Sequence, residues 1–591
     1  MSGEALFTLA VVAAMVLCLA LDVLQPDVVV FSALGALLVC GVLEPAEALS
    51  GFANPAMITV GVLFVVAYAA QAAGVLEYAA FRVLGRGDGV RRSLVRMMLP
   101  VTGFSAFLNN TPIVAMFLPA VREWARRRGL SPSRFLMPLS YASIFGGLCT
   151  LIGTSTNLVV NGMYQEAAGR TLGLFELAWV GIPGAVLATA YTVLVVPRWL
   201  PDRGDPAAEL EADERRYLFE MRVLPESPLC GRTVEEAGLR NLGTTFLAEI
   251  VRGHDVLAPV RPTDVIRPGD RLIFTGAAEG AVQLHRIQGL VPVQDRDLYD
   301  ELRRRGPGRI VEAVVSRSSP LLGRPLRESN FRGRYDAVVL AVHRHGARIH
   351  REIGRLVLRP GDTLLLLTGP DFFKRWNRSR EFYLMSTVSE VPRVDRTRAW
   401  LTGAALGGMV VLSASGVFSV LQSAVLAAVF LLFTRCVTPV EARRALEINV
   451  LVVIASALGI GRALEKTGAA GQVAHALIGV VQDHGPLAVL AAVYAFTSLL
   501  TGFITNNAAA ALAFPVAMSA ARASGLDPAP FAVAVAVAAS ASFASPVAYQ
   551  TNMMVFGPGG YRFLDFVKVG APLHLLYFGA SLFIIPRVWS F

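Results

Sequence analysis

Charged residues are scarce in this chain. They make up 17% of the 591 residues, against about 25% in a typical soluble domain. Hydrophobic residues make up 54%, and apolar runs near the roughly 20 residues needed to span a bilayer recur in both halves. The composition excludes an ordinary soluble protein. It predicts a polytopic α-helical membrane protein, which we place in the plasma (inner) membrane.

Residues for metal binding and catalysis are also few. The chain has 5 cysteines and 8 histidines, and the cysteines lack the spacing of a zinc site or of a disulfide framework. The apolar spans contain no central aspartate or glutamate, so the carboxylate relay of many proton-driven transporters lacks candidates. They also contain no converging set of histidine, cysteine and carboxylate. We therefore predict that the protein is not an enzyme.

The net charge of +10 does not indicate a nucleic-acid partner. The arginines gather in loops and in a central hydrophilic block, as the positive-inside rule expects for cytoplasmic segments. We therefore predict a cytoplasmic block, with the lipid bilayer and no nucleic acid as the macromolecular surroundings.

Ten apolar stretches read as spans, five on each side of the central block. Five is an odd number, so the two halves must cross the bilayer in opposite directions if the block stays on one side. Inverted repeats of this kind are common in secondary transporters. The predicted spans are 5–24, 28–43, 56–74, 134–157 and 176–197 in the first repeat (1–199), and 399–414, 417–434, 448–463, 530–556 and 571–588 in the second (396–591).

Each half also contains an apolar segment that we predict to be a re-entrant hairpin. Segment 97–121 has arginine clusters on both sides. Entering and leaving on one face keeps both clusters in the cytoplasm. Segment 487–521 has almost no basic flank and should enter from the outside.

Polar residues interrupt the apolar sequence at matching places in the two halves. The first hairpin contains Asn109-Asn110-Thr111 and the second contains Thr505-Asn506-Asn507. A second polar break follows each of them, 47 residues from Asn110 to Asn157 and 46 residues from Asn506 to Asn552. We interpret this matched spacing as an internal repeat with broken helices at 134–166 and 530–556.

Unwound backbone at membrane depth is tolerated only where it lines a cavity or is covered by protein, so these breaks indicate a binding site. Helix N-termini favour anions, and carbonyl ends favour cations. One such residue alone would more often only join helices, but four matched breaks favour a site. We predict a first Na⁺ site from Asn110, Thr111, Gly153, Thr154 and Asn157, and a second from Thr505, Asn506, Asn507, Thr551 and Asn552. The predicted anion contacts are Asn109, Asn110, Thr111, Ser155, Thr156, Asn506, Asn507, Gln550 and Thr551.

The central block is itself duplicated. Ser227–Arg232 recurs as Ser319–Arg324, and Arg267–Asp270 recurs as Arg359–Asp362, each at an offset of 92 residues. Each Pro-Gly-Asp is a turn signal followed by an apolar strand. We predict two small α+β domains at 207–292 and 300–385, joined by a charged linker around 295–309.

At these residues the chain resembles the divalent anion:sodium symporter family of the ion-transporter superfamily. That family has Ser-Asn-Thr at each hairpin tip and a Gly-Thr-Pro-Pro-Asn-like break. Here the central asparagines, Asn110 and Asn506, match strictly, as does Thr111, while the other tip positions keep a side-chain oxygen. The duplicated block resembles paired TrkA C-terminal (regulator of K⁺ conductance) domains, which are typical of a sulfate-type permease branch.

The resemblance implies import of a divalent anion coupled to Na⁺, with sulfate as the favoured substrate. It also implies a homodimer in which a transport domain moves against a scaffold, as in an elevator. A di- or tricarboxylate:Na⁺ symporter is the alternative. A cation channel or exchanger gated by the TrkA-C-like domains is a second alternative. Those domains would bind a small regulatory ligand or nucleotide, or would only reinforce the dimer.

Labelling of introduced cysteines tests the predicted topology. Arg91→Cys, Arg127→Cys and Asp483→Cys, made singly, should react with an impermeant thiol reagent in intact cells only at position 483. The basic flanks of the first hairpin should both be cytoplasmic, whereas position 483 should be external. Labelling at 127 without labelling at 91 would instead show a simple span and contradict the inverted repeat.

Overall fold

The chain forms two compact units in a computed structural model. The first unit comprises Met1–Pro201, Pro392–Val555 and Arg562–Phe591, and the second comprises Asp202–Val391 and Phe556–Tyr561. The structure describes residues 2–21, 24–74, 89–128, 130–200, 218–239, 242, 245–252, 255–257, 260–276, 284, 287–292, 310–316, 319–344, 347–349, 353–368, 372–376, 381–386, 396–481, 484–546 and 549–591. The predicted linker at 295–309 and Asp483 lie outside these residues.

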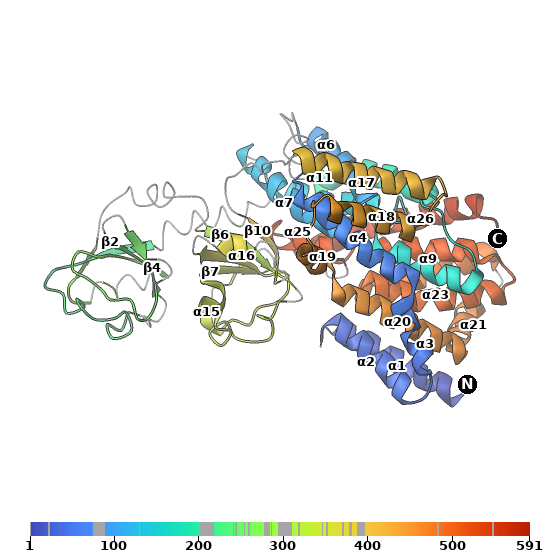
Figure 1. Ribbon diagram of the computed structural model, residues 1–591, viewed down its shortest axis with the longest axis horizontal. Helices are drawn as coiled ribbons and strands as arrows, with labels where there is room; N and C mark the ends of the chain where they lie inside the picture. Colours follow the sequence, from blue (N-terminus) through green and yellow to red (C-terminus); the bar gives the residue numbers. More distant parts are fainter. Residues whose placement is uncertain are drawn as a thin grey trace. The chain divides into compact units, whose positions relative to one another are not determined.

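The first unit is built from helices (Figure 1). Those of the first half are α1 (Gly3–Ala20), α2 (Pro26–Val39), α3 (Pro45–Leu49), α4 (Pro55–Ala72), α6 (Val90–Ser105), α7 (Asn110–Arg127), α8 (Ser133–Gly147), α9 (Ser155–Ala168), α10 (Ala178–Leu194) and α11 (Val196–Trp199). Those of the second half are α17 (Arg396–Ala414), α18 (Val420–Phe433), α19 (Pro439–Ala445), α20 (Ile448–Lys466), α21 (Ala469–Val481), α22 (Pro486–Phe503), α23 (Asn506–Ala523), α24 (Pro528–Ser540), α25 (Gln550–Phe556) and α26 (Phe563–Val588).

Helices lie at all ten predicted spans. Among the described residues, five helical stretches are long and apolar enough to cross a membrane, and five shorter helices are also apolar. These helices agree with the predicted class, a polytopic helical membrane protein. Helix α21 was not predicted, because its 13 residues are too few for a span and follow α20 after a short turn.

The segments predicted as hairpins are pairs of helices joined by a short turn. The pair α6–α7 covers 90–127 rather than 97–121, and the pair α22–α23 covers 486–523 rather than 487–521. The arginines that flank the first segment therefore continue its helices by one to two turns. Asn110 and Asn506 are each the first residue of a helix.

The two broken helices are interrupted slightly earlier in the chain than their polar motifs. Helix α8 ends at Gly147 and α9 begins at Ser155, while α24 ends at Ser540 and α25 begins at Gln550. Ser155 to Asn157 thus form the first turn of a helix. The unwound residues just before α9 are 148–154, and those described before α25 are 541–546 and 549.

Glycines let neighbouring helices approach the unwound segments. Gly181 on α10 lies so close to the backbone of Leu148 that a Cβ would clash with it, and Gly570 on α26 lies equally close to the backbone of Phe543. Small residues allow such close contact between membrane helices. Helices α10 and α26, which come after the broken helices, therefore pack directly against the unwound segments in the same way in both halves.

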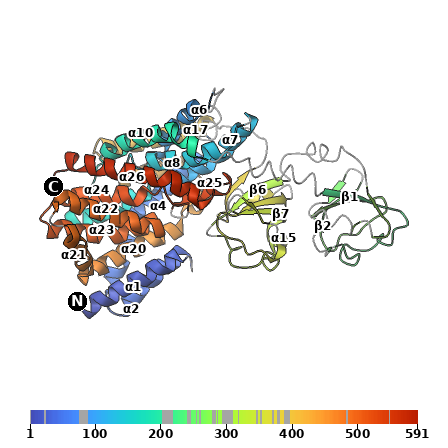
Figure 2. The same cartoon turned by 180° about the vertical axis from the view of Figure 1, so that it is seen from behind.

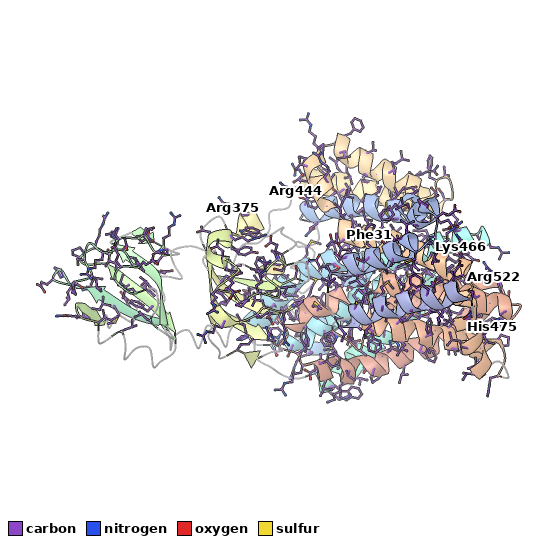
Figure 3. The ribbon with its side chains drawn as sticks, turned by 90° about the horizontal axis from the view of Figure 1, so that it is seen from below. Phe31, Arg375, Arg444, Lys466, His475 and Arg522 are labelled. Carbon is purple, nitrogen blue, oxygen red and sulfur yellow. The ribbon has the colours of Figure 1, made fainter. Side chains whose placement is uncertain are left out.

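Basic residues mark the two ends of α20 (Figure 3). Arg444 precedes the helix and Lys466 ends it, with Arg522 near the same end as Lys466. Lys466 pairs with Glu47 at 2.6 Å, and Arg462 pairs with Glu166. These pairs give each of the two basic side chains an acidic partner.

The second unit contains two five-stranded antiparallel sheets of the same topology (Figure 2). The first has the order β3-β2-β4-β1-β5 and the second β8-β7-β9-β6-β10, so the strands correspond one to one. The strands are β1 (Leu218–Val223), β2 (Thr245–Arg252), β3 (Asp255–Leu257), β4 (Arg271–Gly276), β5 (Leu290–Pro292), β6 (Ile310–Val315), β7 (Ala337–Arg344), β8 (Ala347–Arg348), β9 (Thr363–Thr368) and β10 (Phe382–Ser386), with short helices α15 (Phe331–Tyr335) and α16 (Phe372–Trp376).

The same buried ion pair holds the turn in each sheet domain. Asp270 accepts two hydrogen bonds from Arg252, at 2.9 and 2.8 Å, and Asp362 accepts two from Arg344, at 2.8 and 2.7 Å. Both aspartates are 1% exposed, so the two-pronged contact compensates for the loss of water around the carboxylate. The Pro-Gly-Asp motif recurs because each copy needs this carboxylate.

Candidate anion and cation site

The first hairpin places a hydroxyl beside the amide of Asn110. Ser105 Oγ lies 2.6 Å from Asn110 Oδ1 and 2.7 Å from the carbonyl oxygen of Ser143. A hydroxyl has one proton. If Ser105 donates this proton to the carbonyl, a lone pair of Ser105 Oγ lies beside Asn110 Oδ1. The pair then offers two oxygens to a cation.

The second hairpin repeats this arrangement. Thr501 Oγ1 lies 3.0 Å from Asn506 Oδ1 and 2.8 Å from the carbonyl oxygen of Ala539. Thr501 stands five residues before Asn506, as Ser105 stands five before Asn110. The two halves therefore present the same pair of oxygens at the start of α7 and α23.

A buried asparagine closes each unwound segment. The Asn157 amide nitrogen donates to the carbonyl oxygens of Gly147 and Thr150 at 3.0 and 2.9 Å. Asn552 makes the same two bonds, each 3.1 Å long, to the carbonyls ten and seven residues before it. Both asparagines are fully buried. Each one replaces hydrogen bonds that the broken helix has lost.

Contacts between the halves join each hairpin tip to the opposite broken helix. Thr111 Oγ1 donates to Gln550 Oε1 at 3.1 Å. The Asn507 amide lies 3.1 Å from Ser155 Oγ, and its oxygen accepts from Thr156 at 3.0 Å. The four polar segments that are far apart in sequence thus meet in one place.

Four helices begin at this meeting point, at Asn110, Ser155, Asn506 and Gln550. The first-turn N–H groups of a helix lack intrahelical partners and carry a partial positive charge. No side chain caps the N-terminus of α9 or of α23. Amide donors and hydroxyls are therefore available to an anion between the tips.

Several oxygens suit a cation in the first half. Asn157 Oδ1 is buried and has no hydrogen-bond partner in the part of the chain that the structure describes. A Cβ on Gly147 would lie 2.8 Å from Asn110 Oδ1, and a Cβ on Gly153 would lie 3.0 Å from the carbonyl oxygen of Ser105. Glycine at both places lets the tip and the break approach closely enough to share one ion.

The candidate cation ligands of the second half differ from those of the first. Ser140 Oγ lies 2.9 Å from Thr551 Oγ1 and 2.7 Å from Asn552 Oδ1. Asn552 Oδ1 therefore has a hydrogen-bond neighbour where Asn157 Oδ1 has none. Thr505 Oγ1 is buried without a partner among the described residues and remains a cation-ligand candidate in this half.

The donor set carries no full charge. Its side chains are amides and hydroxyls, and no group of three or more histidine, cysteine or acidic residues able to hold a metal occurs among the described residues. Neutral carbonyl and hydroxyl oxygens suit hard cations rather than the transition metals that favour imidazole or thiolate. An anion bound here would gain from a cation at each tip.

The structure brings most of the predicted site residues together, and it adds four residues that the sequence analysis did not predict. Asn109 is half-buried and makes no hydrogen bond among the described residues. Its predicted contact with the anion therefore stays a prediction. The missed contributors are Ser105, Thr501, Ser140 and Tyr549. The equal five-residue spacing before Asn110 and Asn506 would have identified the first two, whereas Ser140 and Tyr549 have no counterpart of the same type in the other half.

Comparison with known proteins gives similarity over nearly the whole chain. A sequence model described as citrate transporter matches residues 15–538. A Chlamydomonas reinhardtii protein described as a putative sulfur deprivation response regulator is 38% identical, over 95% of this chain and 98% of its own length. An uncharacterized transporter of Synechocystis is 32% identical, over 99% and 97%. Sodium/sulfate cotransporter 1 of C. reinhardtii is 26% identical, over 90% and 83%.

Loss of either closing asparagine should destabilise the helical unit. Asn157→Ala and Asn552→Ala each remove two hydrogen bonds to carbonyls of the unwound segment, which should cost about 1–3 kcal/mol of unfolding free energy. Thermal unfolding in detergent should show a lowered midpoint for both variants. Asn109→Ala, which removes an amide that makes no hydrogen bond to the described residues, is the matched control and should leave the midpoint unchanged. An unchanged midpoint in Asn157→Ala would contradict the closing role.

Proposed function

Because this chain belongs to the citrate transporter family, we propose that it is a secondary active transporter that imports sulfate together with Na⁺. Members of this family transport anions and are not enzymes, in agreement with the sequence prediction. The observation that carries the proposal is the convergence of four helix N-termini with two pairs of neutral oxygens. N-terminal amides suit an oxyanion, and the oxygens beside them suit a hard cation.

Sulfate is favoured by the relatives rather than by the geometry alone. The proteins named sodium/sulfate cotransporters align over most of this chain. A di- or tricarboxylate is the second candidate, because the matching family model is described as citrate transporter. The binding site for either anion would be made from Asn109, Asn110, Thr111, Ser155, Thr156, Asn506, Asn507, Gln550 and Thr551.

Coupling to Na⁺ follows from the neutral donor set. The first ion would be held by Asn110, Thr111, Gly153, Thr154 and Asn157, with Ser105 added, and the second by Thr505, Asn506, Asn507, Thr551 and Asn552, with Thr501 added. Two bound cations would supply positive charge that the protein lacks at this place. A divalent anion would then bind well only after Na⁺, which couples their movements.

Transport would proceed by alternating access. We infer that the two halves are inverted repeats and that the hairpins and broken helices move together against a scaffold, as an elevator within a homodimer. A cation channel or exchanger is the less favoured function, since it would need a carbonyl selectivity filter or a buried carboxylate in the spans.

The two sheet domains would regulate transport from the cytoplasm. We infer that they are TrkA-C-like domains that bind a small ligand or nucleotide. Removing 207–385 should leave the affinity for the anion within a few-fold of wild type and change the transport rate. Measurement of sulfate binding and uptake by the deletion variant tests this role. Loss of binding in a folded deletion variant would show that the domains shape the site instead.

Uptake by proteoliposomes tests the transport function directly. Radiolabelled sulfate should accumulate with an inward Na⁺ gradient and not with a K⁺ gradient. Asn110→Ala and Asn506→Ala each remove one oxygen ligand, which should cost about 1–3 kcal/mol. That corresponds to a roughly 5- to 150-fold rise in the Na⁺ concentration for half-maximal uptake. Equal uptake without Na⁺ would contradict the coupling, and Na⁺-dependent uptake of radiolabelled citrate without uptake of radiolabelled sulfate would establish the carboxylate alternative.

A further inference from the structure

Tyr549 breaks the equivalence of the two halves. It stands three residues before Asn552, and the residue three before Asn157 is Thr154. All four residues belong to the two broken helices or the unwound segments before them. A large phenol in one half therefore corresponds to a small hydroxyl in the other.

The phenol of Tyr549 reaches the hairpin tip of the opposite half. The Asn110 amide nitrogen donates a hydrogen bond to the Tyr549 hydroxyl oxygen. Thr154 is a further hydrogen-bond neighbour of this hydroxyl. Asn110 Oδ1 lies 2.6 Å from Ser105 Oγ, so a polar side chain lies at each end of the Asn110 amide. Asn110 is 5% exposed and Tyr549 is 7% exposed.

Asn506 has only half of this support. Its oxygen lies 3.0 Å from Thr501 Oγ1, but its amide nitrogen has no hydrogen-bond partner in the part of the chain that the structure describes. Asn506 is also only partly buried. The two asparagines hold the same place in their repeats and differ in what fixes the nitrogen end.

The orientation of the amide decides whether it can bind a cation. The terminal torsion of asparagine has a broad, roughly two-fold preference, so a half-turn exchanges oxygen for NH₂ at little cost. The oxygen attracts a cation, whereas the NH₂ group repels it. The Tyr549 hydroxyl accepts from the nitrogen end. With its single proton donated to Thr154, it cannot also donate to the oxygen end, so it selects the binding orientation before any ion arrives.

We propose that Tyr549 is a positioning residue that fixes the Asn110 amide with its oxygen toward the first cation site. This inference rests on the proposed Na⁺-coupled transport. The first site is then preorganised, and the second site must orient Asn506 when the ion binds. The two sites consequently differ in affinity, and the first fills at lower Na⁺ concentration than the second.

The test measures Na⁺ binding to the purified full-length protein by thermal shift, with choline chloride keeping the ionic strength constant. Wild type should show two phases. Tyr549→Phe keeps the ring but loses the hydroxyl, and it should raise the lower half-saturating Na⁺ concentration roughly 5- to 30-fold, so that the phases merge. At saturating Na⁺ the affinity for sulfate should stay within two-fold of wild type, because the anion contacts are unchanged.

Two comparisons separate positioning from a merely structural role. Tyr191→Phe removes another hydroxyl bond between the halves, 3.0 Å to the carbonyl of Val569, and should leave both phases in place. In an Asn110→Asp background either carboxylate oxygen can face the ion, so Tyr549→Phe should change the Na⁺ response less than two-fold. If Tyr549→Phe does not fold, 3-fluorotyrosine at position 549, whose hydroxyl is a weaker acceptor, should still raise the lower half-saturating concentration.

The outcomes distinguish the two proposals. A wild-type protein that shows no response to Na⁺ would overturn the Na⁺-coupled function. A Na⁺-responsive wild type with an unchanged Tyr549→Phe variant would overturn the role of Tyr549 alone. An undiminished effect of Tyr549→Phe in the Asn110→Asp background would also overturn it, since the tyrosine would then act on a group other than the Asn110 amide.

Discussion

Breaking a helix inside a membrane protein exposes backbone groups that lipid cannot satisfy, and the rest of this site depends on how that cost is met. Asn157 and Asn552 meet it by the same means, each donating two hydrogen bonds to carbonyls of its own unwound segment. These bonds use the nitrogen end of each amide, so the oxygen end remains for other partners. The elements that hold the backbone open therefore also provide candidate ligands.

The closeness of the packing follows from this arrangement. A hairpin tip and an unwound segment can share an ion only if their backbones approach closely. At Gly147 and Gly153 they are so close that a Cβ would not fit. Gly181 and Gly570 bring the next helix against each break. Small residues in these places are thus required by the short distances of the site, in addition to their general role in helix packing.

The sequence predicted most of the features that repeat, although Ser105 and Thr501 were missed, and it missed those that occur in one half. Matched spacing located Asn110, Asn506, Asn157 and Asn552, because each half needs the same hydrogen bonds. It placed the breaks a few residues late, since a polar residue can lie in the first helical turn and bond backward to the unwound segment. Tyr549 could not be found in this way, because its partner Asn110 is 439 residues away and belongs to the other half.

The difference between the halves has a consequence for transport that symmetry alone would not give. Two equal sites would load in either order, and an anion could bind beside a single ion at either tip. Unequal support for Asn110 and Asn506 favours one order of loading. If the second ion completes the positive surroundings that a divalent anion requires, then the weaker site controls when the anion binds. A transporter with this order would avoid moving the anion with only one ion bound, and the coupling would then be set by Asn506, the asparagine with fewer hydrogen bonds.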